Sequence, residues 1–193
     1  FEIMNFPILS SLILLPLIGA LFLLFFKDND NSTTGKYVAL FTSFVNFFIS
    51  VYLWFLFDSS ISNFQFIEEK EWLTGFVNFK LGIDGISILF ILLTTFITPL
   101  CIISVNNTVK VRLCDFLIAI LVMESLMIGV FCSLDLIIFY LFFEAGLIPM
   151  FLIIGIWGGA RRVYSAFKFF LYTLLGSVLM LIAIISIFWL SGT

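Results

Sequence analysis

Residues 136–156 read LIIFYLFFEAGLIPMFLIIGI, an apolar run whose one charged residue is Glu144. A helix needs about 20 predominantly apolar residues to cross the roughly 30 Å hydrocarbon core of a bilayer. The stretch therefore predicts a membrane-spanning helix with a carboxylate embedded in it. This prediction decides the fold class, because the rest of the chain repeats the pattern.

Five further segments have the same apolar character. The six expected spans cover approximately residues 6–26, 37–57, 86–105, 116–132, 136–156 and 166–190. Hydrophobic residues make up 63% of the 193 residues and charged residues 11%, whereas soluble domains contain about 45–50% apolar residues. We therefore expect an all-α, polytopic transmembrane helix bundle that forms a single domain over 1–193. Residues 58–85 are expected to be a loop on the outer face.

Charge and cysteine usage exclude several classes of function. The net charge is -3 and the basic residues are scattered, which argues against nucleic acid as a partner. The chain has no histidine, and Cys101, Cys114 and Cys132 show no C-x-x-C spacing. Zinc, haem and iron-sulfur sites are therefore not expected on this chain. No Walker, Rossmann or nucleophile motif is present, so we expect no cofactor here.

The basic residues predict an orientation in the membrane. Seven of the nine lie on the face that the first, third and fifth loops share: Lys27, Lys36, Lys110, Arg112, Arg161, Arg162 and Lys168. Lys70 and Lys80 lie in the second loop. Because Lys and Arg are retained on the cytoplasmic or matrix side, these three loops are expected inside and both termini outside.

Glu144 is the first candidate for function. It lies about eight residues into its span, which at 1.5 Å per residue places it ~12 Å deep. A carboxylate at the centre of a span costs about 2.5–3.5 kcal/mol on insertion scales, so it should face protein or water, or be protonated. Either state suits a proton carrier. The alternative is a structural glutamate satisfied by a neighbouring helix.

Pro149 follows Glu144 by five residues. It has no N–H to donate to the carbonyl of Ala145, and so frees a backbone acceptor next to the carboxylate. We expect the helix to bend here, and the exposed carbonyl could hold water in a hydrogen-bonded path for a proton.

Glu124 and Lys168 are further candidates. Glu124 lies at a similar depth in the fourth span, so that two carboxylates on adjacent helices form a candidate proton relay. The alternative is a structural glutamate hydrogen-bonded across helices. Lys168, just inside the sixth span, is a weaker candidate that could snorkel toward the inner face or bias protonation of a water chain.

Two aspartates are interpreted as structural. Asp135 precedes the fifth span and is expected to cap the N-terminus of that helix. Asp84, followed by Gly85, predicts a turn that leads into the start of the third span.

Two long stretches carry a family resemblance. The first runs from Trp72 to Ser104, with LGIDGISILFILLTTFITPLCIIS at its core. The second is FYLFFEAGLIPMFLIIGIWGGARRVYSAFKFFLYTLLGSVLMLIA (139–183). Both closely resemble chain M of NADH-quinone oxidoreductase, called chain 4 in mitochondria. The likeness includes Glu144, Pro149 and the Trp157-Gly158-Gly159 turn, and a weaker likeness extends through nearly the whole chain.

The resemblance implies an antiporter-like subunit of the membrane arm of respiratory complex I, which takes part in proton translocation coupled to electron transfer from NADH to quinone. Glu144 matches the glutamate on the family's fifth helix, which pairs there with a lysine on a later, broken helix. The family has about fourteen helices in two inverted five-helix repeats, and this chain resembles the N-terminal six-helix portion. We therefore expect a second polypeptide to carry the remaining helices, or the sequence to be incomplete.

The same resemblance implies partners and a location. The expected partners are other membrane-arm subunits and lipids, while NADH, FMN, iron-sulfur clusters and ubiquinone are expected on other subunits. The chain would belong to NADH:ubiquinone reductase without performing redox chemistry itself. Its Phe and Ile excess favours the mitochondrial inner membrane, with the N-terminus toward the intermembrane space. The alternative location is a bacterial plasma membrane, with the N-terminus in the periplasm.

Two other functions remain as alternatives to complex I. One is a subunit of a multisubunit cation/proton antiporter, which shares the inverted-repeat plan and the membrane glutamate. The other is a structural membrane scaffold that does not pump, in which the buried carboxylates serve only helix packing.

Overall fold

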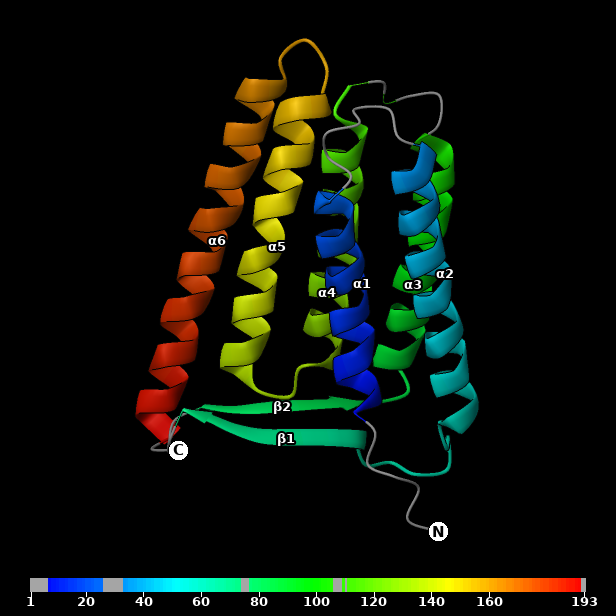
Figure 1. The fold of residues 1–193 in the computed structure, drawn as a ribbon. Coiled ribbons are helices and arrows are strands. Elements are labelled where there is room, and N and C mark those ends of the chain that lie inside the picture. The colour runs from blue at the N-terminus through cyan, green and yellow to red at the C-terminus, as the bar shows by residue number, and fades with distance from the viewer. Residues whose placement is uncertain (1–6, 26–32, 74–76, 106–108, 110, 192–193) are drawn as a thin grey trace.

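Within the part of the chain that the structure describes, the fold consists of six helices and one two-stranded hairpin (Figure 1). It was obtained as a computed structural model that describes residues 7–25, 33–73, 77–105, 109 and 111–191. In chain order the elements are α1 (Ile8–Leu24), α2 (Thr33–Leu56), β1 (Gln65–Leu73), β2 (Val77–Ile83), α3 (Ser87–Ser104), α4 (Leu113–Cys132), α5 (Leu136–Trp157) and α6 (Arg162–Ser191).

The helices have the lengths that a bilayer requires. α2 to α6 are each long and apolar enough to cross a membrane, and α1 is a shorter apolar helix of 17 residues, which at 1.5 Å per residue is ~25 Å long. The predicted class, a polytopic helix bundle, is confirmed. Helix ends differ from the expected spans by at most four residues, at the starts of α2 and α6.

The helices alternate in direction, so that α1 begins and α6 ends at the end of the bundle where the hairpin lies (Figure 1). α1 packs most extensively against α4, α2 packs against α3 and α1, and α4, α5 and α6 follow one another side by side. Of the basic residues used to predict orientation, Lys27 and Lys110 lie outside the described residues.

The hairpin was not expected, since residues 58–85 read as an irregular loop. β1 and β2 pair antiparallel, with Glu69 opposite Lys80. Leu81 and Ile83 of β2 are fully buried in one apolar cluster with residues of α1, α2, α3 and α4. The Lys80 carbonyl also accepts a hydrogen bond from the backbone N–H of Leu134, at 3.0 Å. The segment therefore closes one end of the bundle.

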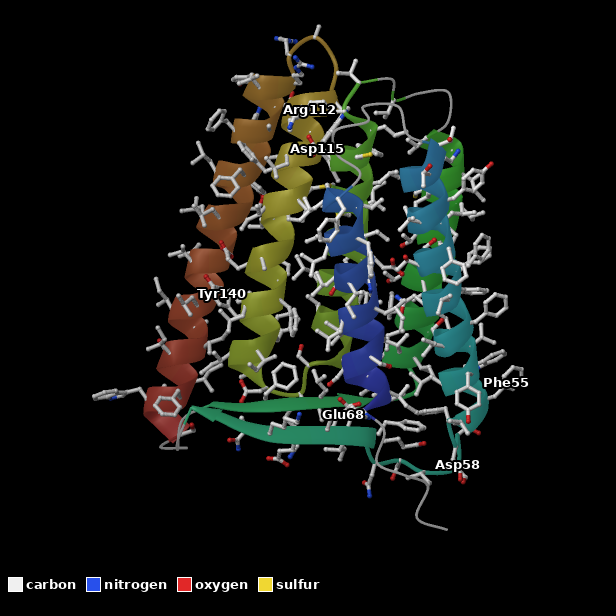
Figure 2. The ribbon with its side chains drawn as sticks, in the orientation of Figure 1. Phe55, Asp58, Glu68, Arg112, Asp115 and Tyr140 are labelled. Atoms are coloured by element: carbon white, nitrogen blue, oxygen red, sulfur yellow. The ribbon has the colours of Figure 1, made fainter. Side chains whose placement is uncertain are left out.

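Glu68 attaches the hairpin to α1. Its carboxylate accepts hydrogen bonds from the backbone N–H groups of Leu9, at 2.8 Å, and Ser10, at 3.1 Å, and also from the Ser10 hydroxyl. These N–H groups belong to the first turn of the helix, where no intrahelical partner exists. Glu68, placed below α1 in Figure 2, therefore caps a helix 59 residues away in sequence.

The cap expected at Asp135 is confirmed, and Asp84, where a turn was expected, also caps a helix. The Asp135 carboxylate accepts hydrogen bonds from the backbone N–H groups of Ile137 and Ile138 at the start of α5. Asp84 accepts one from the backbone N–H of Ser87, at 2.7 Å, where α3 begins.

Large apolar side chains cover the outside of the bundle, as the outward-pointing sticks in Figure 2 show. On α6 the buried residues are Ala166 and Ser177. Such a surface is suited to lipid or to further membrane helices and not to water.

Candidate functional site

Glu124 of α4 lies in the interior of the bundle, with its side chain directed toward α2 and α3. The Asn46 amide Nδ2 on α2 donates a hydrogen bond to Glu124 Oε1 at 2.9 Å. Asn46 is fully buried and Glu124 is 2% exposed. Among the described residues, neither Glu124 Oε2 nor Asn46 Oδ1 has a hydrogen-bond partner. Unsatisfied buried polar atoms are costly and rare, and their presence is typical of a functional site or of an unseen water or proton.

Hydroxyl side chains surround this pair. The Ser50 hydroxyl of α2 and the Thr95 hydroxyl of α3 share a hydrogen bond of 2.7 Å. The Ser125 hydroxyl of α4 donates to the carbonyl of Ile13 in α1, at 2.6 Å. We call the buried polar side chains of α2, α3 and α4 the polar seam; they are Ser43, Asn46, Ser50, Thr94, Thr95, Thr98, Glu124 and Ser125.

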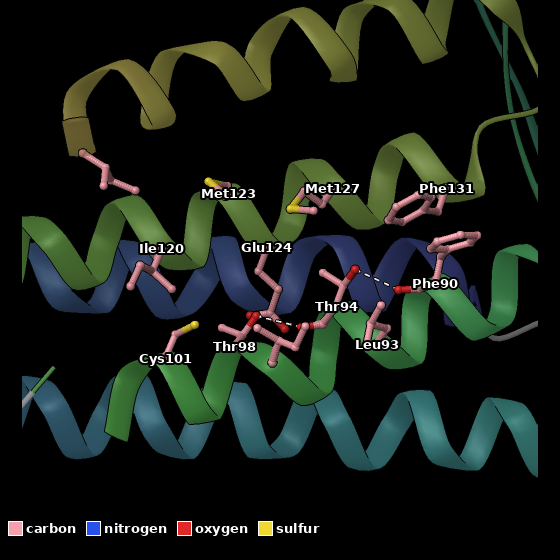
Figure 3. A pocket seen from close by; sticks show the side chains of 12 residues that line it. Phe90, Leu93, Thr94, Thr98, Cys101, Ile120, Met123, Glu124, Met127 and Phe131 are labelled. Atoms are coloured by element: carbon pink, nitrogen blue, oxygen red, sulfur yellow. Dashed lines mark hydrogen bonds between the residues drawn. The ribbon is translucent and has the colours of Figure 1, made fainter. Parts of the chain in front are cut away.

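A pocket of about 430 Å³ opens beside Glu124, between α3 and α4. Its lining is mostly apolar, and its polar members include Thr94, Thr98 and Glu124 (Figure 3). The two threonine hydroxyls donate to carbonyls of their own helix, at 2.8 and 2.9 Å. Since each hydroxyl oxygen keeps lone pairs, both can still accept a hydrogen bond.

Glu144 lies on a different face of the bundle. Its side chain is half-buried, and its Oε2 atom is buried without a hydrogen-bond partner within the described part of the chain. Phe151, seven residues further along α5, contacts Phe167 and Phe170 of α6 through its ring. Seven residues are almost two helical turns, so Glu144 shares this face and is directed toward α6.

The antiparallel packing of α5 and α6 places Ser177 opposite Glu144. Phe151 meets Phe170, with ring centroids 5.3 Å apart. Stepping seven residues back along α5 and seven forward along α6 leads to Glu144 and Ser177. Ser177 is 2% exposed on a helix that is otherwise exposed along most of its length. The interface between α5 and α6 therefore contains two polar side chains, Glu144 and Ser177, at the same height along the helices.

The two carboxylates face away from each other. A Cβ added to Gly129 of α4 would lie 2.5 Å from the ring of Phe142, so these two positions mark the α4–α5 contact. Glu144 is two residues from Phe142, about 200° around the helix, and Glu124 is five residues from Gly129, about 140° around. A proton relay between Glu124 and Glu144 would consequently need intermediates.

Pro149 lies within α5, and Lys168 lies on the surface of α6. Pro149 is buried inside α5, which continues as one helix from Leu136 to Trp157. Lys168 is exposed and lies over the Tyr164 ring, with Nζ 5.9 Å from its centroid. It is two residues from Ala166, which faces α5, so it points away from Glu144. Their proposed roles stay predictions.

Sequence reasoning missed Asn46 and the polar seam. A signal was available, because Ser43, Asn46 and Ser50 recur at helical spacing within the apolar second span and so occupy one face. Among the described residues, no group of three or more His, Cys, Asp and Glu is arranged to hold a metal ion.

Several known proteins are similar to this chain. A family model described as NADH:quinone oxidoreductase/Mrp antiporter, TM, matches residues 133–193. The chain is 51% identical to NADH-quinone oxidoreductase subunit M of Rhodobacter capsulatus, over 96% of this chain and 36% of that protein. The resemblance is confirmed. NADH-ubiquinone oxidoreductase chain 4 of Marchantia polymorpha is 48% identical, over 96% of this chain and 38% of that protein.

The likeness to the subunit M and chain 4 family extends along nearly the whole chain, which spans little more than a third of the length of these relatives. A solved structure, of the membrane-bound sulfane sulfur reductase (MBS), an archaeal respiratory membrane complex, has the same fold. The match covers 98% of this chain and 28% of one chain of that structure, with a TM-score of 0.77 and 19% sequence identity.

Proposed function

We propose that the chain is the N-terminal portion of an antiporter-like membrane-arm subunit of respiratory complex I. It takes part in proton translocation coupled to electron transfer from NADH to quinone, as a subunit of NADH:ubiquinone reductase. It performs no redox chemistry of its own, and NADH, FMN, iron-sulfur clusters and ubiquinone are bound by other subunits.

One observation carries this proposal: Glu144 holds a buried carboxylate oxygen that has no partner among the described residues, inside a membrane-spanning helix of a chain similar to subunit M over 96% of its length. An intramembrane carboxylate is costly unless it exchanges a proton or meets a partner. Glu144 therefore binds and releases the translocated proton, while Pro149 frees a nearby carbonyl for water. Glu124 is the second carboxylate that handles protons.

The exposed surface of α6 supports the view that the site is incomplete on this chain. Glu144 faces α6, whose outer side presents large apolar residues such as Leu175 and Leu179. The resemblance to the subunit M and chain 4 family implies that the matching glutamate pairs with a lysine on a later helix. We propose that the remaining helices, on a second polypeptide or on a continuation of this one, cover α6 and bring this lysine.

The charge of the loops supports an orientation, and the Phe and Ile excess supports a location. We propose that the bundle lies in the mitochondrial inner membrane, among lipids and other membrane-arm subunits, with the hairpin toward the intermembrane space. The Arg112–Asp115 ion pair, labelled in Figure 2 at the end of the bundle away from the hairpin, would then lie on the matrix side. In a bacterium the corresponding sides are the periplasm and the cytoplasm.

The substitution Glu144→Gln tests the role of the carboxylate. In sealed vesicles that contain the complete complex, the variant should lose NADH-driven proton pumping, because glutamine cannot release a proton. Electron transfer from NADH to a water-soluble acceptor should continue. The matched control is Glu69→Gln, since Glu69 is an exposed residue of the hairpin. Unchanged pumping in Glu144→Gln would support the structural scaffold instead.

A second function, that of a cation/proton antiporter subunit, is favoured by the family description, which covers both kinds of protein over residues 133–193. Mass spectrometry of the purified native membrane complex separates the two. Complex I subunits in stoichiometric amounts, together with the missing helices, support our proposal. Antiporter subunits, or this chain alone, would contradict it.

A further inference from the structure

The Glu124–Asn46 pair is joined by one hydrogen bond, and it leaves two acceptor atoms without a donor. Asn46 Nδ2 donates to Glu124 Oε1 at 2.9 Å. The remaining atoms of the pair, Glu124 Oε2 and Asn46 Oδ1, are both buried without a partner among the described residues. Both are acceptors as long as Glu124 is ionised. A single proton on Oε2 turns that atom into a donor, and the acceptor available within the pair is Asn46 Oδ1.

The surroundings of Glu124 contain no charge that would stabilise its ionised form. By sequence, α1 and α3 carry no charged residue, and the one on α2 is Lys36. Lys36 is ten residues from Asn46, about 15 Å along the helix. Asp115 of α4 is ion-paired to Arg112 at 2.6 Å. An ionised carboxylate in this position would be desolvated and unpaired, which membrane interiors disfavour strongly.

Other titratable groups lie apart from the pair. Tyr37 and Tyr52 of α2 are both exposed, and Glu144 of α5 faces α6. Cys101 of α3 is the other titratable residue that lines the pocket. The protonation state of Glu124 is therefore determined mainly by its burial and by Asn46.

The pocket gives this proton a route. Its lining is apolar apart from a few side chains, among them Thr94, Thr98 and Glu124, so water that enters the pocket would bind at these polar groups. Thr94 and Thr98 line it beside Glu124 (Figure 3). Their hydroxyls bond to backbone carbonyls, and rotation of either hydroxyl would allow it to donate to Glu124 once the carboxylate is ionised.

We propose that Glu124 and Asn46 form a proton-binding site separate from Glu144, in which a protonated Glu124 is joined to the Asn46 amide by two reciprocal hydrogen bonds. The proton moves between Glu124 and water in the α3–α4 pocket. Asn46 acts as a positioning residue, because it holds the acid in place and links α2 to α4. The inference deepens the role proposed for Glu124, but its test does not depend on translocation.

Infrared spectroscopy of the purified membrane complex tests the protonation state. The wild-type protein should show a carbonyl band of a protonated carboxylic acid that is lost in Glu124→Gln and shifted in Asn46→Leu. The control Glu144→Gln should keep this band. A spectrum of Glu124→Gln identical to that of the wild type would overturn the proposal, whatever the pumping measurements show.

Thermal unfolding of the same complex tests the pairing. Glu124→Gln replaces the protonated acid by an amide of the same shape, which keeps both hydrogen bonds to Asn46. Its melting temperature should therefore equal that of the wild type, while Glu124→Leu and Asn46→Leu should melt lower. If Glu124→Gln melts as low as Glu124→Leu, no reciprocal pair exists.

Deuterium exchange of the carboxylic acid tests the route. In heavy water the Glu124 band should move as the proton is replaced, and Thr98→Val, which removes one pocket hydroxyl at constant shape, should slow this exchange several-fold without removing the band. An unchanged exchange rate would overturn the assignment of the pocket as the path.

Discussion

Removing Glu68 tests whether the hairpin stabilises the start of α1. Its carboxylate accepts three hydrogen bonds from Leu9 and Ser10. A hydrogen bond to a charged group contributes about 1.5–3 kcal/mol, and loss of a helix N-cap costs about 0.5–2 kcal/mol. The three bonds are only partly buried and share one carboxylate, so we expect Glu68→Ala to weaken local stability by ~2 kcal/mol, which allows for water replacing part of the loss.

Hydrogen exchange at the Leu9 and Ser10 amides measures this effect in the intact complex. Since 1.4 kcal/mol is a factor of ten, these amides should exchange ~30-fold faster in Glu68→Ala. The matched control is Glu69→Ala, whose exposed ion pair with Lys80 contributes at most about 1 kcal/mol. Equal exchange in the two variants would refute the assignment of Glu68 as the cap of α1.

Three further outcomes are expected. The hydroxyl and the backbone N–H of Ser87 lower the pKa of Asp84 from its ordinary 3.8; this stabilisation of the start of α3 should be complete above that value and decline as the pH falls through the lowered pKa. Amide exchange at the start of α3 against pH checks this, and Asp84→Asn should remove the dependence. Gly129→Val should force Phe142 away from α4 and destabilise the α4–α5 contact by about 1–3 kcal/mol, seen as a lower melting temperature of the complex; Gly159→Val, at an open loop position, should have no such effect. Ser125→Ala should lower the free energy of unfolding by about 1 kcal/mol, because the hydrogen bond to the Ile13 carbonyl is lost. Ser186→Ala should lower it much less, because the Ser186 hydroxyl bonds within its own exposed helix.

The helices were predictable from sequence because a bilayer imposes a length and an apolar composition on each of them. The Asp135 cap and the turn at Asp84 were also predictable, since both are local features within a few residues of the helix that follows. The hairpin was not, because Leu81 and Ile83 owe their burial to contacts with helices far away in sequence. A strand of this kind has no long periodic signal, and its two buried residues are separated by Gly82.

The candidate site was predictable in part. The depth of Glu124 and Glu144 follows from position within a span, and it identified both as candidates. The direction in which each side chain points depends on helix rotation, which the sequence leaves open when nearly every face is apolar. Asn46 could be recognised as the partner of Glu124 only when α2 and α4, 78 residues apart at these positions, were placed side by side.

The packing of α1 on α4 has a consequence for how the protein is made. The Ser125 hydroxyl meets the Ile13 carbonyl across 112 residues of chain, and synthesis proceeds at about 5–20 residues per second. For roughly 6 to 22 seconds, α1 must therefore wait in the membrane without its main neighbour. During this interval the side chains that α1 later buries, most of them apolar, are open to lipid, so biogenesis of this bundle depends on delayed pairing and not on stepwise stacking of successive helices.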